Sequence, residues 1–154
     1  TERKAVIDQD KCVGCGRCIG VCPKDAVCAP NDESNDILNK KIAEYSLAVL
    51  KDRPHFHVSL VIDVSPNCDC HAENDIPIVP DVGMFASFDP VALDRACADA
   101  VNRQPVIAES QLDRMPHVHH DHFTDSAPAT NWKSCLEHAE KIGIGTQEYE
   151  LIEI

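Results

Sequence analysis

The chain has 154 residues, of which 44% are hydrophobic and 26% charged, so it can form one domain, or one domain with a small extra segment. Its 14 Lys and Arg against 26 Asp and Glu give a formal net charge of −12, which argues against nucleic acid or an anionic membrane as partner. The nine cysteines are an odd number, so they cannot all pair as disulfides within one chain.

Other features of the composition indicate where the protein works. No apolar run approaches the roughly 20 residues of a membrane helix, and no secretory signal is recognisable. We therefore expect a cytoplasmic protein whose cysteines serve metal or redox chemistry. The chain begins with Thr1 instead of Met, so we expect its N-terminal boundary to result from processing or from excision out of a longer protein.

The first part of the chain divides into a cysteine-rich segment and a helix. Five cysteines lie within residues 1–30, and the polar stretch 30–36 predicts a loop that separates this region from an α/β domain over 31–154. Asn35 or Asp36 can cap a helix that ends before Arg53-Pro54, because apolar residues then recur at helical spacing: Leu38, Ile42, Tyr45 and Val49.

Two strands and a second helix are predicted next. Apolar side chains recur at every second position in residues 57–64, and one more apolar residue lies on the other face, which indicates a strand covered on both sides. A second short buried strand is predicted at residues 82–86. Asp89-Pro90 supplies an N-cap and a proline at the first helical position, so a helix should run to about Arg103. Its predicted buried stripe is Leu93, Ala96, Cys97, Ala100 and Val101.

The last third carries less pattern. Residues 105–130 contain the run 117–122 with four histidines, and Asn131 is predicted to cap a final helix that Gly143 closes. Residues 149–154 fit a terminal edge strand. The fold class is therefore α+β or α/β: a small ferredoxin-like iron–sulfur loop region attached to an α/β layer.

The strongest functional signal is the segment from Cys12 to Pro23, which reads C-x2-C-x2-C-x3-C-P. This spacing is typical of bacterial ferredoxin-type iron–sulfur ligation, in which evenly spaced thiolates wrap one loop around a cubane. Zinc more often takes two separated pairs of ligands, so a [4Fe-4S] cluster is favoured over zinc.

The fourth ligand is open at this stage. Cys12, Cys15 and Cys18 share one cluster, and Cys22 is the first candidate to complete it, although in two-cluster ferredoxins this last cysteine serves the other cluster. The remaining candidates are Cys28, Cys68 and Cys70. Cys97 and Cys135 lie on apolar helix stripes and are interpreted as buried core thiols, which leaves too few cysteines for two clusters.

Several stretches together carry a family resemblance: residues 4–8, 64–70, 75–83, 89–94 and 137–145. The chain resembles the C-terminal half of the uncharacterised iron–sulfur centre proteins of anaerobic bacteria and archaea, a domain-of-unknown-function family with an inserted bacterial-type 4Fe-4S ferredoxin module. Members typically carry two ferredoxin runs in a longer protein. The resemblance implies a cluster, and it implies that the second run belongs to a missing N-terminal half or to a second chain.

Two functions follow as hypotheses. The first is a one-electron transfer module that binds a redox partner, with the acidic surface steering a basic docking face. The alternative is a redox enzyme in which the cluster serves a site near Cys68, Cys70 and His71, after the predicted strand 57–64. The histidine run could bind zinc or nickel with Asp121, but a solvated loop is favoured. Asp89 is interpreted as a cap, and Asp81 as a residue that could face the site.

Overall fold

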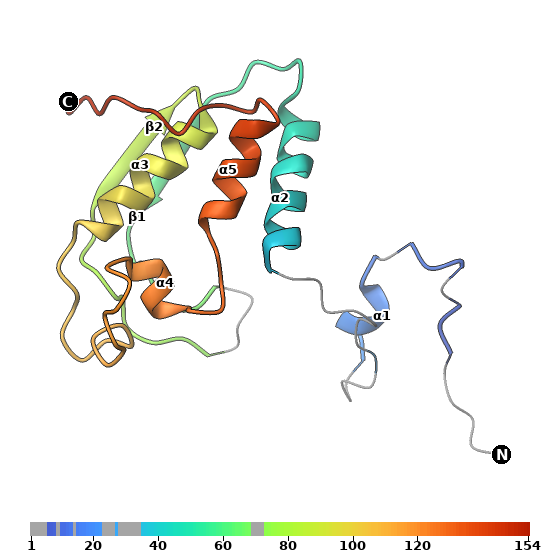
Figure 1. Ribbon diagram of the computed structural model, residues 1–154, viewed down its shortest axis with the longest axis horizontal. Helices are drawn as coiled ribbons and strands as arrows, with labels where there is room; N and C mark the ends of the chain where they lie inside the picture. The colour runs from blue at the N-terminus through green and yellow to red at the C-terminus, as the bar shows by residue number, and fades with distance from the viewer. Residues whose placement is uncertain (1–5, 9, 14, 23–26, 28–34, 69–72) are drawn as a thin grey trace. The chain divides into compact units, whose positions relative to one another are not determined.

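The computed structural model describes residues 6–8, 10–13, 15–22, 27, 35–68 and 73–154. It divides into two compact units, Thr1–Glu33 and Ser34–Ile154, and each unit is described by itself below. Figure 1 shows the helices and strands in chain order: α1 (Arg17–Gly20) belongs to the first unit, and all later elements belong to the second.

The second unit contains one pair of described strands, β1 (His57–Val61) and β2 (Gly83–Ser87). They pair antiparallel, with His57 opposite Ser87 and Val61 opposite Gly83. Helices and an antiparallel strand pair make the unit α+β, which confirms the first of the two predicted classes. The described part of the chain shows no parallel α/β layer, because the two strands pair antiparallel and the described residues 62–68 and 73–82 between them contain no helix.

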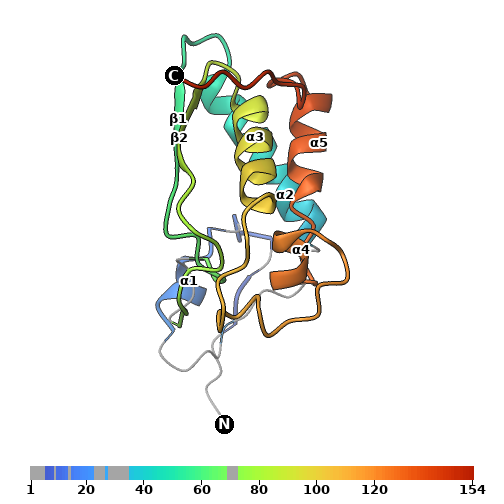
Figure 2. The same ribbon diagram turned by 90° about the vertical axis from the view of Figure 1, so that its left-hand side faces the viewer.

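Helix α3 (Pro90–Asn102) covers one face of the strand pair, as Figure 2 shows. It begins as predicted, because the Asp89 carboxylate accepts hydrogen bonds from the backbone N–H groups of Val91 and Ala92. The predicted stripe of α3 is buried throughout. Part of it joins the largest core cluster, which consists of Val61, Ile78, Val79, Leu93, Cys97, Val101 and Leu112.

The opposite face of the strand pair is exposed, so the prediction of strands covered on both sides is wrong. Val58, Leu60 and Met84 are 55%, 62% and 70% exposed. The alternation of the sequence correctly separates two faces, but α3 packs against the face that carries Ser59 and Val61. The apolar side chains at Val58 and Leu60 therefore point away from the core.

Helices α2 (Asn35–Leu50) and α5 (Lys133–Lys141) lie side by side and enclose a second cluster of Ala43, Val91, Leu136 and Ala139. The helical repeat predicted α2 correctly, yet the apolar residues of that repeat are largely exposed, because α2 turns its Ala43 face to α5. The prediction that Asn131 caps α5 is wrong. Trp132 occupies the cap position, and the Asn131 side chain donates a hydrogen bond to Asp36 instead.

The region with little sequence pattern contains a short helix, α4 (His122–Ser126), whose N-cap is Asp121. Residues 149–154 form no strand and are exposed, so the predicted edge strand is wrong. None of the helices in the described ranges is long and apolar enough to cross a membrane.

Candidate functional site

The cysteine segment of the first unit starts at a charged turn. The backbone N–H of Lys11 donates to the carbonyl of Asp8 at 3.2 Å, and the Lys11 ammonium lies 3.1 Å from the Asp8 carboxylate. Both side chains are well exposed, so the ion pair contributes little to stability. The turn leads directly into Cys12.

A single helical turn then positions the later cysteines. Helix α1 is preceded by Gly16, whose φ of +67° lies in the left-handed region that favours glycine. The carbonyl of Gly16 accepts from the N–H of Ile19 at 3.0 Å, and the carbonyl of Ile19 accepts from the N–H of Cys22 at 3.2 Å. Backbone hydrogen bonds therefore fix the path from Gly16 to Cys22, with Cys18 inside the turn.

The thiols of this segment are accessible but are not gathered. Cys12, Cys15 and Cys18 are exposed and Cys22 is half-buried. Within the part of the chain that the structure describes, no three His, Cys, Asp or Glu side chains lie close enough together to hold a metal ion. The donor chemistry nevertheless fits an iron–sulfur cluster, because such clusters take soft thiolates, and binding energy commonly folds a small metal-binding segment.

Of the more distant candidates, the structure describes Cys68 alone; Cys28, Cys70 and His71 lie outside the described residues. Cys68 is exposed. The loop before it is held by hydrogen bonds: the Asn74 amide donates to Ser65 Oγ at 3.0 Å and accepts from the Asn67 N–H at 3.3 Å. These bonds hold the described residues just before Cys68, and the Cys68 side chain is exposed.

The two cysteines predicted to be core residues agree with the structure. Cys97 is buried in the larger cluster, and Cys135 packs against the smaller one. Burial raises the pKa of both thiols, and the Asp94 carboxylate raises both further, while a hydrogen bond with Ser59 acts in the opposite direction on Cys97. Both side chains therefore stay protonated and act as small apolar groups.

Asp121, which the sequence offers as a metal ligand beside the histidine run, has a structural role. Its carboxylate caps α4, accepts a hydrogen bond from the Trp132 indole N–H at 3.0 Å, and lies 3.0 Å from the Lys133 ammonium. Burial raises the pKa of Asp121, but the hydrogen bonds from Lys133, Trp132 and Thr124 outweigh burial and hold it below the ordinary 3.8.

The sequence analysis did not identify Asp125, which is 2% exposed. Its Oδ1 lies 2.9 Å from the His119 ring nitrogen and 3.0 Å from the His119 backbone nitrogen. The histidine run is therefore only partly a solvated loop, since His119 binds Asp125 and the His122 ring contacts the Gln104 carbonyl at 2.9 Å. Four histidines in six residues left metal binding open beside the favoured solvated loop, and they gave no signal for a buried carboxylate that contacts His119.

Asp89 and Asp81 both stabilise the backbone. Beyond capping α3, Asp89 accepts a hydrogen bond from the Thr146 N–H at 2.9 Å and so ties the chain after α5 to the start of α3. Asp81 accepts from the N–H of Asp63 at 2.9 Å, where Asp63 has a φ of +48°. Asp81 thus stabilises a strained turn after β1, and the structure does not place it in a site.

One known protein family matches a large part of the chain. The family described as "Domain of unknown function (DUF362)" matches residues 12–99, from the first motif cysteine to the last turn of α3. The chain belongs to the DUF362 family. This confirms the predicted link to a domain of unknown function, while the inserted module and the position as a C-terminal half stay predictions.

One curated relative adds a second finding. The chain is 48% identical over 29 residues to a protein named as an uncharacterised ferredoxin of Methanocaldococcus jannaschii. The matched stretch covers 19% of this DUF362 chain and 38% of that protein, so the chain spans well under two thirds of its relative. No solved structure matches the chain.

Proposed function

We propose that this DUF362 protein binds one [4Fe-4S] cluster and serves as a one-electron transfer module. Cys12, Cys15 and Cys18 are the proposed ligands, with Cys22 as the fourth. The observation that carries the proposal is the C-x2-C-x2-C-x3-C-P spacing. Support comes from the accessible thiols, from the left-handed turn at Gly16, and from the matched relative named as a ferredoxin.

The residues around the thiols have roles in this proposal. When bound, the cluster supplies a carrier for single electrons. Lys11 and Arg17 are the sequence neighbours of Cys12 and Cys18, and we expect their positive charges to reduce the cost of gathering negative charge. Val13, Ile19 and Val21 are 88%, 42% and 72% exposed within the same segment, and we expect them to limit the access of water to the ligands.

The proposed partner is a redox protein with a basic docking face. A formal net charge of −12 attracts such a surface over a range set by the Debye length, about 8 Å at physiological ionic strength. The rate of electron exchange should therefore fall as salt is added, because charge complementarity acts mainly on the association rate. A rate independent of ionic strength would contradict this part of the proposal.

Metal analysis tests the cluster. The full chain, purified without oxygen, should contain about four irons and about four acid-labile sulfides per chain. Cys12→Ser, Cys15→Ser and Cys18→Ser should each lose most of this iron. Cys135→Ser is the matched control, since Cys135 packs in the core and should leave the iron content unchanged. Stoichiometric zinc without sulfide would refute the proposal.

A second candidate, a redox enzyme, is favoured by the exposed Cys68, which follows residues that hydrogen bonds with Asn74 hold in place. The test uses Cys22→Ser, Cys28→Ser, Cys68→Ser and Cys70→Ser, assayed for iron and for turnover of a candidate substrate. If Cys68→Ser or Cys70→Ser keeps the full cluster and loses turnover, the enzyme replaces the electron-transfer module. If Cys28→Ser, Cys68→Ser or Cys70→Ser loses iron while Cys22→Ser keeps it, the substituted residue is the fourth ligand instead of Cys22.

A further inference from the structure

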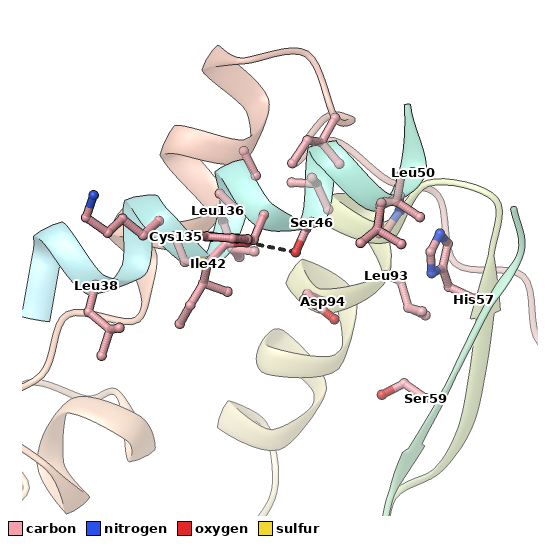
Figure 3. Close-up of a pocket in the computed structure, with 18 of the residues that line it drawn as sticks. Leu38, Ile42, Ser46, Leu50, His57, Ser59, Leu93, Asp94, Cys135 and Leu136 are labelled. Atoms are coloured by element: carbon pink, nitrogen blue, oxygen red, sulfur yellow. Dashed lines mark hydrogen bonds between the residues drawn. The ribbon is translucent and has the colours of Figure 1, made fainter. Parts of the chain in front are cut away.

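A hollow of about 850 Å³ opens in the second unit between α2 and β1, with α3 and α5 as its floor. We call it the α2–β1 groove. Figure 3 shows its walls, with Leu38, Ile42, Ser46 and Leu50 from α2 facing His57 and Ser59 from β1. Leu93 and Asp94 from α3, and Cys135 and Leu136 from α5, complete the labelled lining.

The groove exists because α2 and the strand pair diverge. The backbone of α2 comes close to α5 and to no other described helix or strand, while α3 stays against the strands. The space between them is lined mainly by aliphatic side chains. Leu38, Ile42 and Val49 of α2 are 54%, 49% and 66% exposed at its wall, an arrangement that costs free energy unless something covers it.

One carboxylate stands in this apolar lining. Solvent reaches Asp94, but within the described ranges it has neither a hydrogen bond nor an ion pair. Burial raises its pKa, and the charge of His57 lowers it in part. Ser46, across the hollow, donates its hydroxyl proton to the Ile42 carbonyl at 2.9 Å (Figure 3). Two basic side chains, Lys41 and His57, also line the groove, but within the described ranges no hydrogen bond or ion pair joins either of them to Asp94.

We propose that the α2–β1 groove binds a small molecule with an apolar body and a protonated amine, and that the amine pairs with Asp94. The volume lies within the roughly 300–1,000 Å³ typical of small-molecule sites. Mostly apolar walls with a small number of fixed polar groups are also typical of such sites. The site is independent of the cysteine segment, so it stands or falls separately from the proposed cluster.

The chemistry of the lining selects among ligands. A carboxylate in a partly desolvated wall repels anionic ligands. When a neutral ligand covers it, the carboxylate loses hydrogen bonds to water and gains no charged partner, which costs free energy. An ammonium group offsets this desolvation cost by donating a charge-assisted hydrogen bond to the carboxylate, which is stronger than a hydrogen bond between neutral groups. The aliphatic side chains of α2 and α5 then cover the apolar body of the ligand.

The test is calorimetric titration of the full chain, purified without oxygen, with three probes that differ only in the head group: 4-phenylbutylamine, 4-phenylbutanol and 4-phenylbutyrate. The amine should bind most tightly and the carboxylate most weakly. Asp94→Asn should weaken the amine at least about tenfold and reduce its advantage over the alcohol. Glu137→Gln is the matched control, since it removes the same charge from an exposed site on α5 outside the groove.

Two further outcomes decide the proposal. Ser46→Phe places a ring in the groove and should abolish binding of the amine, while circular dichroism shows that the variant is folded. Equal affinity for the three probes, no binding of any probe, or unchanged affinity in Asp94→Asn would each overturn the proposal. Sedimentation that finds a dimer which Ser46→Phe dissociates would also overturn it, because the groove would then be an interface between two copies.

Discussion

Asp121 offers the sharpest test of how the second unit is stabilised. Its carboxylate accepts from the N–H groups of Phe123 and Thr124 at 3.1 and 3.3 Å and from the Trp132 indole N–H at 3.0 Å, and it is 5% exposed. Asp121→Ala removes all these acceptors and leaves the indole N–H of the half-buried Trp132 without its partner. The change therefore affects α4 and the start of α5 together.

The expected cost follows from these bonds. Loss of an N-cap costs about 1 kcal/mol, and loss of the partner of a buried donor costs about 1–3 kcal/mol. The Lys133 ammonium is half exposed, so its ion pair adds little. We expect Asp121→Ala to lower the free energy of unfolding by about 2–4 kcal/mol. Asp121→Asn keeps one acceptor oxygen for the cap and should cost less.

The assay is urea unfolding of the full chain, followed by circular dichroism and by the fluorescence of Trp132, the single tryptophan. His117→Ala, an exposed residue of the same run, is the control and should change the free energy of unfolding by less than about 0.5 kcal/mol. A cost for Asp121→Ala no larger than the control refutes the reasoning. Zinc that stabilises the unmodified chain but not Asp121→Ala would show that Asp121 is a metal ligand after all.

Three other predictions follow from single contacts. Gly145→Ala should cost about 1–3 kcal/mol of stability in urea unfolding, because its Cβ would lie 2.0 Å from Asp89 Oδ1; a neutral effect would contradict the close approach. Asp94→Asn should leave stability at pH 7 unchanged or higher, since a raised pKa means that the fold disfavours the charged form, and a loss above about 1 kcal/mol would contradict this. The pKa values of Asp121 and Asp125 are lowered, so their stabilisation is complete above the ordinary 3.8 and is lost as the pH falls through the lowered values. Thermal unfolding between pH 7 and pH 2 should show this loss, reduced in Asp121→Asn, whereas an equal acid sensitivity in that variant would argue against it.

Local signals account for what the sequence predicted well. Asp89-Pro90 sets the start of α3 through bonds that reach only two or three residues along the chain, and the apolar stripe that includes Leu93 and Cys97 follows from helical geometry. The cysteine spacing is also a local feature of the sequence, which is why the motif can be recognised without knowledge of the three-dimensional structure.

The remaining features depend on partners distant in the sequence. Helical spacing predicts α2, but it does not say that Ala43 faces α5 while Ile42 lines a groove. Alternation gives β1 two faces, and only the position of α3 decides that Leu60 is exposed. The local sequence leaves metal binding by Asp121 open beside the favoured solvated loop, and it gives no sign of the hydrogen bond from Trp132, eleven residues away.

The central claim is that the Cys12–Cys22 segment holds a redox-active [4Fe-4S] cluster. The most direct measurement is electron paramagnetic resonance of the full chain, purified without oxygen, before and after reduction with dithionite. The account predicts a signal that appears on reduction, disappears on re-oxidation, persists in Cys135→Ser and is absent in Cys12→Ser. A spectrum that reduction leaves unchanged, or an equal signal in Cys12→Ser, would contradict the account.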